Sequence, residues 1–381
     1  MRILHIMLAC FYNEGFTYQE NMLTQMNKKD GHEVKIIAST EVFKSNGQTG
    51  YCDPERYINE DGIEVVRLPY NRKIPSKIVR KVRKYEGTWE EIESFKPDII
   101  FCHSLMFWDL NVIAKYKMKN PHVKLYADFH SDFNNSATNF ISRNILHKMI
   151  YKPIIKRHID KFEKLFYITY ETKVFLQELY GIKDNYLEFY PLGGIIEDEE
   201  IRQKYRKEIR ERLHIKDDDI MLLHSGKMTA AKKTINILSA ISSLDSNNIK
   251  LVIVGVFEEE YEKQVKPFLA GDNRIIFEGW KSGSELRQYM YAADLYIQPG
   301  SQSAAAQNAV CCNCCLAVAP HISYKHLFGD RVFYAESKDD IKSLLEKIIA
   351  NSSLLDDKRK QSFSYAKEKL NYQVLSRVYV K

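Results

Sequence analysis

Short apolar runs alternate with stretches of helical periodicity along most of the chain. Runs of four to eight apolar residues are typical of strands buried on both faces of a parallel sheet, and apolar residues three or four apart predict a helix. In the N-terminal half, strands are predicted at residues 2–10, 33–39, 63–68, 97–103, 123–129 and 166–169, with a helix at 19–29. Strands that alternate with helices predict a doubly wound α/β domain.

The same pattern restarts after a linker at residues 191–194. Further strands are predicted at 220–225, 251–255, 274–277, 295–298 and 316–319, and helices at 234–243, 261–268, 284–293, 304–311 and 339–350. A charged helical segment over 197–219 is expected to pack loosely beside this second domain. We therefore predict a first domain over 1–192, a second over 193–364, and a C-terminal helix over 365–381 that crosses back to the first.

Composition narrows the class of protein without naming an activity. The 381 residues are 45% hydrophobic and 28% charged, which excludes wholesale disorder and coiled coil. The net charge of +6 is too small to indicate nucleic-acid binding by itself. We expect neither a signal peptide nor a membrane-spanning segment. Seven cysteines, an odd number, favour a reducing cytoplasm.

Basic residues follow the first strand of the second domain. Ligands of parallel sheets bind beyond the carboxyl ends of the strands, where free N–H groups favour phosphate. Lys227 and Lys232 are five residues apart across a predicted strand-to-helix turn that begins at Gly226. Both lysines could reach one diphosphate. By spacing alone, two solvated lysines in a loop remain an equally good interpretation.

A family resemblance rests on four segments in order. Ser225–Lys233 resembles the G-R-L-x-x-x-K-G element of GT-B glycosyltransferases, especially the retaining glycosyltransferase family 4. Ile249–Gly255 is similar to its L-x-I-V-G strand, and Ile275–Trp280 to its V-x-F-x-G element. Tyr291–Pro299 resembles its Y-x-x-A-D-x-x-x-x-P run. In the N-terminal half, the loop at Gly15 and the G-H-E-V sequence at residues 31–34 resemble the corresponding family segments.

The resemblance implies a GT-B fold, with two Rossmann-like domains facing a central cleft. It implies glycosyl transfer from a UDP- or GDP-sugar with retention of configuration and without a metal. Lys227 stands where the family has Arg, and Lys232 matches the family Lys; together they would neutralise the departing diphosphate. Donor-binding positions implied by the matched segments are Gly15, Gly226, Gly255 and Glu278.

The chain departs from the family where an E-x(7)-E motif is usual. Gln307 matches the second Glu, which contacts the donor ribose in the family, and Gln302 is our choice for the first. Gly300, Ser301 and Ser303 precede a predicted helix and are expected to offer free N–H groups to the donor. The departure keeps two alternatives open: a non-hydrolysing nucleotide-sugar epimerase, and a catalytically silent partner that binds nucleotide sugar or membrane.

Histidines follow two strands of the first domain. His130 lies after the strand at 123–129 and looks like the family histidine beside the transferred sugar. His103 and Asp128, at the ends of neighbouring strands, are further candidates on the acceptor side. For each histidine, a structural side chain without a catalytic role is the competing interpretation.

Two remaining features concern partners. The cysteines between 311 and 315 occupy a small-residue turn of the family, and we interpret them as buried apolar residues rather than as a metal site. Residues 72–85 carry seven basic and no acidic side chains above an apolar stripe of Ile78, Val79, Val82 and Tyr85, and a second basic patch runs from Arg143 to Lys164. A solvated helix face, an anionic membrane surface and RNA are the alternatives for these patches. We expect a lipid-linked saccharide acceptor, as in capsule or O-antigen synthesis, and peripheral attachment to the inner face of the cytoplasmic membrane.

Overall fold

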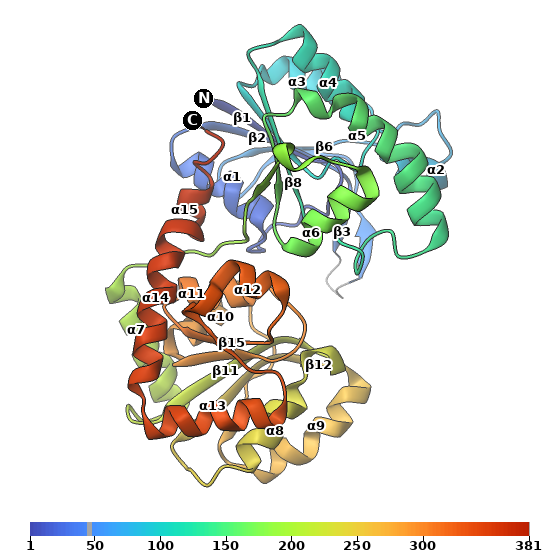
Figure 1. The fold of residues 1–381 in the computed structure, drawn as a ribbon. Coiled ribbons are helices and arrows are strands. Elements are labelled where there is room, and N and C mark those ends of the chain that lie inside the picture. The colour runs from blue at the N-terminus through green and yellow to red at the C-terminus, as the bar shows by residue number, and fades with distance from the viewer. Residues whose placement is uncertain (44–47, 381) are drawn as a thin grey trace. The chain divides into compact units, whose positions relative to one another are not determined.

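The computed structural model describes residues 1–43 and 48–380. The chain forms two units, each built on its own sheet (Figure 1). Met1–Pro191 and the chain from Leu375 onward make up the first unit, and Leu192–Val374 the second. None of the helices within the described ranges combines the length and apolarity that a bilayer span requires.

The sheet of the first unit has the order β10-β9-β8-β7-β1-β2-β6-β5, and its neighbouring strands are parallel except for β5 and β6. Its strands are β1 (Arg2–Met7), β2 (Glu33–Ala38), β5 (Arg56–Ile58), β6 (Glu64–Arg67), β7 (Ile99–His103), β8 (Lys124–Phe129), β9 (Lys164–Tyr167) and β10 (Leu187–Phe189). A separate antiparallel pair joins β3 (Glu41–Phe43) to β4 (Thr49–Tyr51).

Helices pack against this sheet and bury its apolar strands. They are α1 (Gln19–Lys29), α2 (Ser76–Val82), α3 (Thr88–Phe95), α4 (Leu110–Lys119), the π-helix η1 (Ile141–Tyr151), α5 (Lys152–His158), η2 (Ile159–Lys161), α6 (Tyr170–Phe175), η3 (Leu176–Tyr180) and η4 (Asp184–Tyr186). The central strand β1 is buried from Ile3 to Met7, as its unbroken apolar run predicts.

The sheet of the second unit is parallel throughout, in the order β13-β12-β11-β14-β15-β16. Its strands are β11 (Ile220–Met228), β12 (Ile249–Phe257), β13 (Ile275–Phe277), β14 (Leu295–Gln298), β15 (Cys315–Val318) and β16 (Phe333–Tyr334). Its helices are α7 (Glu199–Arg212), η5 (Ala230–Lys232), α8 (Thr234–Ser242), α9 (Glu259–Gly271), α10 (Gly283–Ala292), α11 (Ala305–Cys311), α12 (Ile322–Phe328), η6 (Gly329–Arg331), α13 (Lys338–Ala350), α14 (Ser353–Lys369) and α15 (Tyr372–Leu375).

Two strands of this sheet run further than their sequence suggests. We expected β11 to end before Gly226 and β12 at Gly255, but the strands continue to Met228 and Phe257. Gly226 lies opposite Gly255 in the ladder, and a Cβ on Gly255 would come within 1.9 Å of the Gly226 carbonyl oxygen. These glycines therefore permit a close approach inside the ladder instead of ending the strands.

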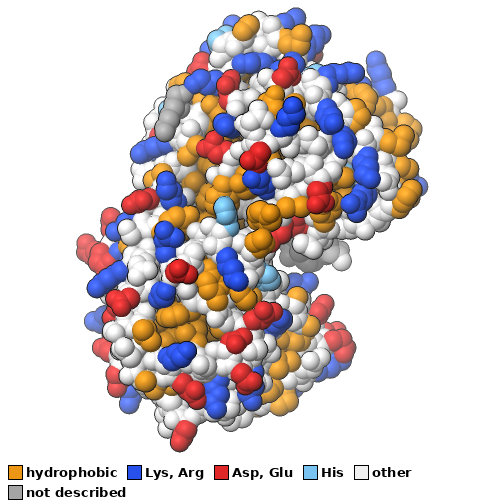
Figure 2. Space-filling model, viewed as in Figure 1, with side chains coloured by type: hydrophobic (Ala, Val, Ile, Leu, Met, Phe, Trp, Pro, Cys, Tyr) orange, Lys and Arg blue, Asp and Glu red, His pale blue; other side chains and the backbone are white. Residues whose placement is uncertain are grey.

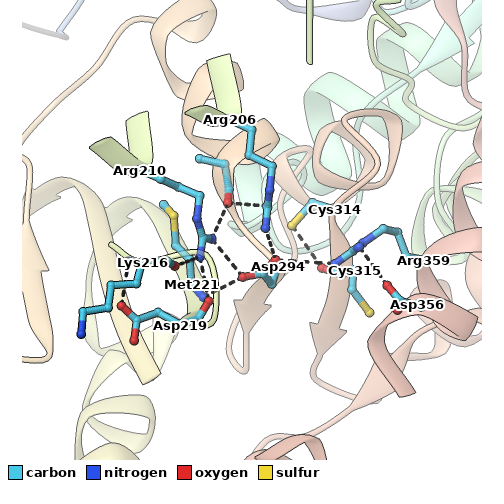
Figure 3. Close-up of polar contacts among 11 residues, drawn as sticks. Arg206, Arg210, Lys216, Asp219, Met221, Asp294, Cys314, Cys315, Asp356 and Arg359 are labelled. Atoms are coloured by element: carbon cyan, nitrogen blue, oxygen red, sulfur yellow. Dashed lines mark hydrogen bonds and ion pairs between the residues drawn. The ribbon is translucent and has the colours of Figure 1, made fainter. Parts of the chain in front are cut away.

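Helix α7 is bound to the second unit more firmly than its charged sequence suggests (Figure 3). Arg206 and Arg210 donate to the carboxylate of Asp294, at 2.7 and 3.1 Å, and both donate to the Ala292 carbonyl. The backbone N–H of Met221 also donates to Asp294, at 2.8 Å. The expectation of loose packing is wrong, because Arg206 and Arg210 point inward and bind Asp294. That carboxylate lies 88 and 84 residues further along the chain, so the sequence does not reveal the contact.

The C-terminal part is divided between the units. Where we expected a single crossing helix, α14 and α15 precede a short final segment that belongs to the first unit. In that segment Tyr379 is fully buried, and its hydroxyl donates to Asn27 Oδ1 at 2.8 Å. Arg377 forms an ion pair with Asp30 at 2.6 Å.

Candidate functional site

The strand order of the second unit reverses between β11 and β14, and this is the position where open α/β sheets bind ligands. The segments that follow these two strands contact each other. The Ser301 N–H donates to the Ala231 carbonyl at 2.8 Å. A Cβ on Gly300 would lie 2.1 Å from that same oxygen and 2.5 Å from the carbonyl carbon of Lys232. Only glycine fits at position 300, and its small size allows the loop after β14 to pack directly against the loop after β11.

Lys232 lies in this contact as a half-buried cation. Its side chain crosses Gly226, whose added Cβ would stand 3.7 Å from Lys232 Cε. Burial lowers the pKa of Lys232 to about 8. No carboxylate of the described residues pairs with its ammonium group, whereas the adjacent Lys233 forms an ion pair with Glu336. Lys227 projects from the end of β11 and is exposed. The site thus holds an uncompensated positive charge beside a second, solvated one.

The neighbouring His224 is neutral and does not compete for an anion. It is fully buried, and burial lowers its pKa to about 4. Its ring nitrogens bond to the Ile297 carbonyl at 2.7 Å and the Thr234 hydroxyl at 3.0 Å. His224 on β11 is therefore hydrogen-bonded to β14 and to α8, next to the loop that carries Lys227 and Lys232.

The backbone donors that we expected after β14 are partly used within the protein. The Ser301 N–H is bonded to Ala231, and the Ser303 N–H donates to the Tyr324 hydroxyl at 2.9 Å. Gln298 donates to the Ser301 carbonyl, and His321 bonds to the Gly300 carbonyl at 3.0 Å. The N–H groups of Ser301 and Ser303 are therefore engaged by the protein's own acceptors.

The two glutamines of this region differ in environment. Gln307 lies on α11 and is 5% exposed, and its Oε1 is buried without a hydrogen-bond partner among the described residues. A buried acceptor of this kind costs free energy unless a ligand supplies a donor. Gln302 has interactions of its own and is less buried. Gln307 is therefore the better candidate for a ligand hydroxyl.

Glu278 is held by cations and a phenol. It receives hydrogen bonds from Arg212 at 2.9 Å and from the Tyr289 hydroxyl at 2.5 Å. Burial would raise the pKa of Glu278, but these bonds and the neighbouring charges lower it. Its carboxylate joins β13 to α7 and α10, so its interactions in the structure are with protein groups.

In the first unit, Asp128 connects two histidines. The carboxylate is fully buried and lies 3.0 Å from His103 Nδ1 and 3.4 Å from His130 Nε2. Burial alone would raise the pKa of Asp128, but the two histidines outweigh it and hold that pKa below its usual range. Burial opposes charge on His130, and the carboxylate outweighs it and raises the pKa of the ring. The His130 side chain is 37% exposed and is the one open to a ligand.

His103 continues this network inward. Asn27 Nδ2 donates to the Ser376 carbonyl, so Asn27 Oδ1 accepts from His5 Nε2 at 3.0 Å. Burial lowers the pKa of His5 to about 3, so its Nδ1 is unprotonated and accepts from His103 Nε2 at 3.1 Å. His103 thus connects His5 to Asp128, with its Nδ1 3.0 Å from the carboxylate. Because His103 is 3% exposed and Asp128 is fully buried, neither offers a surface to an acceptor. They position His130 instead.

Gly15 lies in the loop after β1, where the strand order of the first sheet reverses between β1 and β7. Its φ of +75° falls in the left-handed region that favours glycine, and no atom lies within 4 Å of an added Cβ. The residue shapes the loop through backbone conformation alone.

A cavity that the sequence did not indicate lies in the first unit. Its volume is about 510 Å³, and small polar side chains line it beside Arg80 and Lys81. His147 forms part of the wall, with Nδ1 2.5 Å from the Tyr180 hydroxyl and Nε2 3.3 Å from Ser136 Oγ. Burial lowers the pKa of His147 to about 4, and the Arg83 charge adds to the effect. The residues that line the cavity are scattered from position 9 to position 151, which explains why no local sequence motif predicts the cavity.

The basic run at 72–85 is rearranged relative to our prediction. The helix spans only Ser76–Val82, and Ile78 is 54% exposed instead of lying beneath the charge. Arg83 adopts a left-handed conformation and pairs with Glu41 at 3.3 Å. Arg83 is therefore a structural ion, and the outward charge near it comes from its neighbours.

The cysteine cluster is buried, as interpreted from the sequence. Cys311, Cys312, Cys314 and Cys315 are at most 3% exposed, and burial raises the pKa of each thiol. In residues 1–43 and 48–380, no group of three or more histidine, cysteine or acidic side chains is arranged to hold a metal ion.

Comparisons with known proteins agree with this architecture. Residues 205–369 match the family described as Glycosyl transferases group 1. A glycosyltransferase from Rickettsia africae ESF-5 is 14% identical with a TM-score of 0.70, covering 99% of this chain and 96% of that one. Anabaena Alr3699/HepE in complex with UDP is 13% identical with a TM-score of 0.71, covering 99% and 98%.

A third solved structure, WaaG, described as a glycosyltransferase involved in lipopolysaccharide biosynthesis, is 15% identical with a TM-score of 0.62 and coverage of 100% and 99%. No curated protein matches the sequence. The two Rossmann-like units have the GT-B fold, and residues 205–369 are similar to the group 1 glycosyl transferases.

Proposed function

We propose that this protein transfers a glycosyl group from a nucleoside-diphospho-sugar to a saccharide acceptor with retention of configuration. The observation that carries the proposal is Lys232, a half-buried ammonium group that no described carboxylate neutralises, in the loop after β11 where the strand order of the second sheet reverses. A diphosphate supplies the missing negative charge, and the exposed Lys227 adds a second contact.

The nucleoside part of the donor is assigned to the same unit. Gln307 Oε1 is a buried acceptor without a partner in the described residues, and a ribose hydroxyl is a suitable donor to it. UDP appears in the name of the Anabaena structure, and UDP-glucose in that of a related one, 12% identical with a TM-score of 0.64 and coverage of 100% of this chain and 98% of that one. We therefore place UDP-sugars first among donors and keep GDP-sugars as the second choice.

The proposed reaction needs no protein nucleophile. The acceptor hydroxyl oxygen bonds to the anomeric carbon on the face that the diphosphate leaves, and the bond from that carbon to the phosphate oxygen breaks. The acceptor proton passes to the departing phosphate. Lys227 and Lys232 stabilise the charge that develops on the leaving group, which is the work of a divalent cation in other transferases.

The first unit is assigned to the acceptor. His130 presents a partly exposed, Asp128-linked ring that can donate a hydrogen bond close to the reacting carbon. The 510 Å³ cavity beside Arg80 and Lys81 is large enough for a sugar ring and rich in hydroxyl and amide groups. We propose a lipid-linked saccharide of a surface polysaccharide, such as capsule or O-antigen, reached from the cytoplasmic face of the membrane.

Thermal shift measurements test the donor site directly. UDP or GDP is expected to raise the melting temperature of the wild type, and Lys232→Met to abolish the shift. Lys233→Met is the matched control, because Lys233 occupies the same loop but already pairs with Glu336. An undiminished shift in Lys232→Met would contradict the diphosphate assignment.

Turnover of a radiolabelled UDP-sugar separates the alternatives. Transfer to acceptor or slow release of free sugar supports the transferase, whereas an altered sugar still joined to the nucleotide identifies an epimerase. Binding without either product identifies a silent partner. Activity retained in EDTA supports charge stabilisation by the lysines, and activity restored only by added Mg²⁺ or Mn²⁺ contradicts it.

A further inference from the structure

Apolar side chains are exposed along one helical face of the first unit. Phe140 is 76% exposed, Ile141 67%, Ile145 45% and Met149 70%. The last three recur every fourth residue along η1, so they form a stripe on one side of that helix. The opposite side of η1 and α5 is buried through His147, Tyr151, Ile154 and Ile155. The stripe is therefore an outer surface and not a part of the core.

Basic side chains continue this surface. Lys148, Lys152 and Lys156 also recur every fourth residue, and Arg143 lies in the same helix. None of these four forms an ion pair with a described residue, and no acidic residue occurs between Asp132 and Asp160. The pKa of Lys152 is lowered by burial and then by the charges of Lys156 and Lys148. Positive charge is thus concentrated here and left unneutralised.

Helix α2 lies beside η1 and extends the same surface. The Tyr151 hydroxyl donates to the Lys81 carbonyl, which fastens the two helices. On α2, Ile78 is 54% exposed beside Lys77, Arg80 and Lys81. Figure 2 shows hydrophobic and basic side chains gathered at the edge of the molecule where α2 lies in Figure 1. We define the docking face as the exposed side chains of α2, η1, α5 and Phe140.

We propose that the docking face binds an anionic lipid bilayer, with Phe140, Ile141, Ile145 and Met149 inserted among the acyl chains and the lysines and arginines on the headgroups. Exposed apolar residues flanked by cations that have no acidic partner among the described residues suit an interface that is apolar inside and negative at its surface. A second copy of the chain would place the same cations against each other. Nucleic acid matches the cations through its phosphates, but two isoleucines and a methionine lack the planar rings on which bases stack.

The docking face adds a membrane contact to the proposed function, and it rests on that proposal only for the lipid-linked acceptor. The inner side of η1 contributes Ser142, Leu146, His147 and Tyr151 to the 510 Å³ cavity, and α2 contributes Arg80 and Lys81. The same two helices that meet the bilayer therefore also form the wall of the candidate acceptor cavity. A headgroup-linked saccharide could enter that cavity from the membrane surface.

Apolar insertion distinguishes this proposal from attraction by charge alone. Charge alone predicts complete release at high salt, since ions screen surface charges, whereas buried apolar side chains are insensitive to salt. In cosedimentation with vesicles of phosphatidylcholine and phosphatidylglycerol, we expect wild-type binding at low salt and a measurable remainder at high salt. Pure phosphatidylcholine vesicles are expected to bind more weakly.

Two double variants and two controls test the surface. Ile145→Glu with Met149→Glu, and separately Lys148→Glu with Lys152→Glu, are each expected to lower vesicle partitioning by at least about tenfold. Met118→Glu is the apolar control, because Met118 is 69% exposed on α4, and Lys266→Glu is the charge control on α9. Circular dichroism and an unchanged UDP-induced thermal shift show that each variant is folded, so the outcome is independent of the donor site.

A second readout does not depend on loss of binding. Met149→Trp is expected to shift its fluorescence to the blue with anionic vesicles, and Met118→Trp is expected not to. The proposal is overturned if wild type stays in the supernatant at low salt, if the Glu pair at 145 and 149 partitions like wild type, or if the same variants dissociate a dimer of the lipid-free protein.

Discussion

Asp294, which is buried, and Lys232, which is half-buried, are both charged side chains of the second unit, but among the described residues only Asp294 has partners of opposite charge. Its carboxylate receives hydrogen bonds from Arg206, Arg210 and the Met221 N–H. Lys232 receives no such compensation from the described residues, and its pKa is lowered to about 8 by burial alone.

The difference separates a structural ion from a binding ion. A buried pair is destabilised when one partner is removed, because the other is left uncompensated. A buried charge without a partner costs stability in the free protein and regains it when a ligand of opposite charge arrives. On this basis the Asp294 cluster stabilises the second unit, and the loop that carries Lys227 and Lys232 is our proposed diphosphate site.

The largest expected effect is the loss of stability when Asp294 is replaced. Asp294→Asn leaves Arg210, 3% exposed, without its carboxylate, and we expect a loss of about 3–5 kcal/mol in the free energy of unfolding. Chemical denaturation measures it. Asp217→Asn, at an exposed position before β11, is the control. A loss below about 1 kcal/mol would place the Asp294 cluster among ordinary surface ion pairs.

Lys232→Met is expected to have the opposite profile. Removing an uncompensated charge should leave the unfolding free energy of the ligand-free protein unchanged or higher. Affinity for UDP or GDP should fall by about 10–100-fold, since a hydrogen bond to a charged group contributes about 1.5–3 kcal/mol. Calorimetry measures affinity, and denaturation measures stability. If Lys232→Met loses stability as Asp294→Asn does, the contrast between the two sites is broken.

The pH dependence of binding sharpens the same contrast. Lys232 is protonated below its pKa of about 8, so diphosphate affinity should be level there and fall by up to about tenfold per pH unit above it. Stability of the free protein should rise between pH 8 and 10.5, because the unfolded chain then binds the extra proton. Lys232→Met should remove both slopes, and slopes that persist would assign them to another group.

His130→Ala extends the comparison to the first unit. Asp128 keeps His103 as a partner, so stability should change little, while turnover falls by about tenfold and the donor KM stays nearly constant. His130→Asn, which keeps a donor, should recover part of the turnover. Steady-state kinetics with the identified donor measures the effect. Unchanged turnover in His130→Ala would return His130 to a structural role.

Much of the fold could be predicted because local pattern and tertiary structure agree. The prediction of β14 matches its observed bounds, since Asp294 and Pro299 enclose four buried residues. The helix α1 likewise begins and ends as predicted. The glycines misled the prediction of strand ends. Gly226 and Gly255 were interpreted as the ends of β11 and β12, but they lie opposite each other in the ladder and both strands continue beyond them.

Features set by distant contacts could not be predicted. Nothing near Arg210 in the sequence shows that it reaches Asp294, 84 residues away. The switch-point lysines were indicated by their position after a strand, but the lack of a counter-ion for Lys232 required the packing around it. Only the charge of the docking face could be predicted. The basic residues of η1 can be counted in the sequence, but the exposure of Ile145 and Met149 is known only from the structure.

The end of the chain closes the inner side of the histidine network, and this affects how the protein should be handled. Tyr379 and the Ser376 carbonyl occupy both polar atoms of the Asn27 side chain, which orients His5 and, through it, His103. A purification tag or a truncation at this terminus would disturb the wall behind the candidate catalytic histidine. Fusions placed at the N-terminus, where Met1 is 51% exposed, avoid that disturbance.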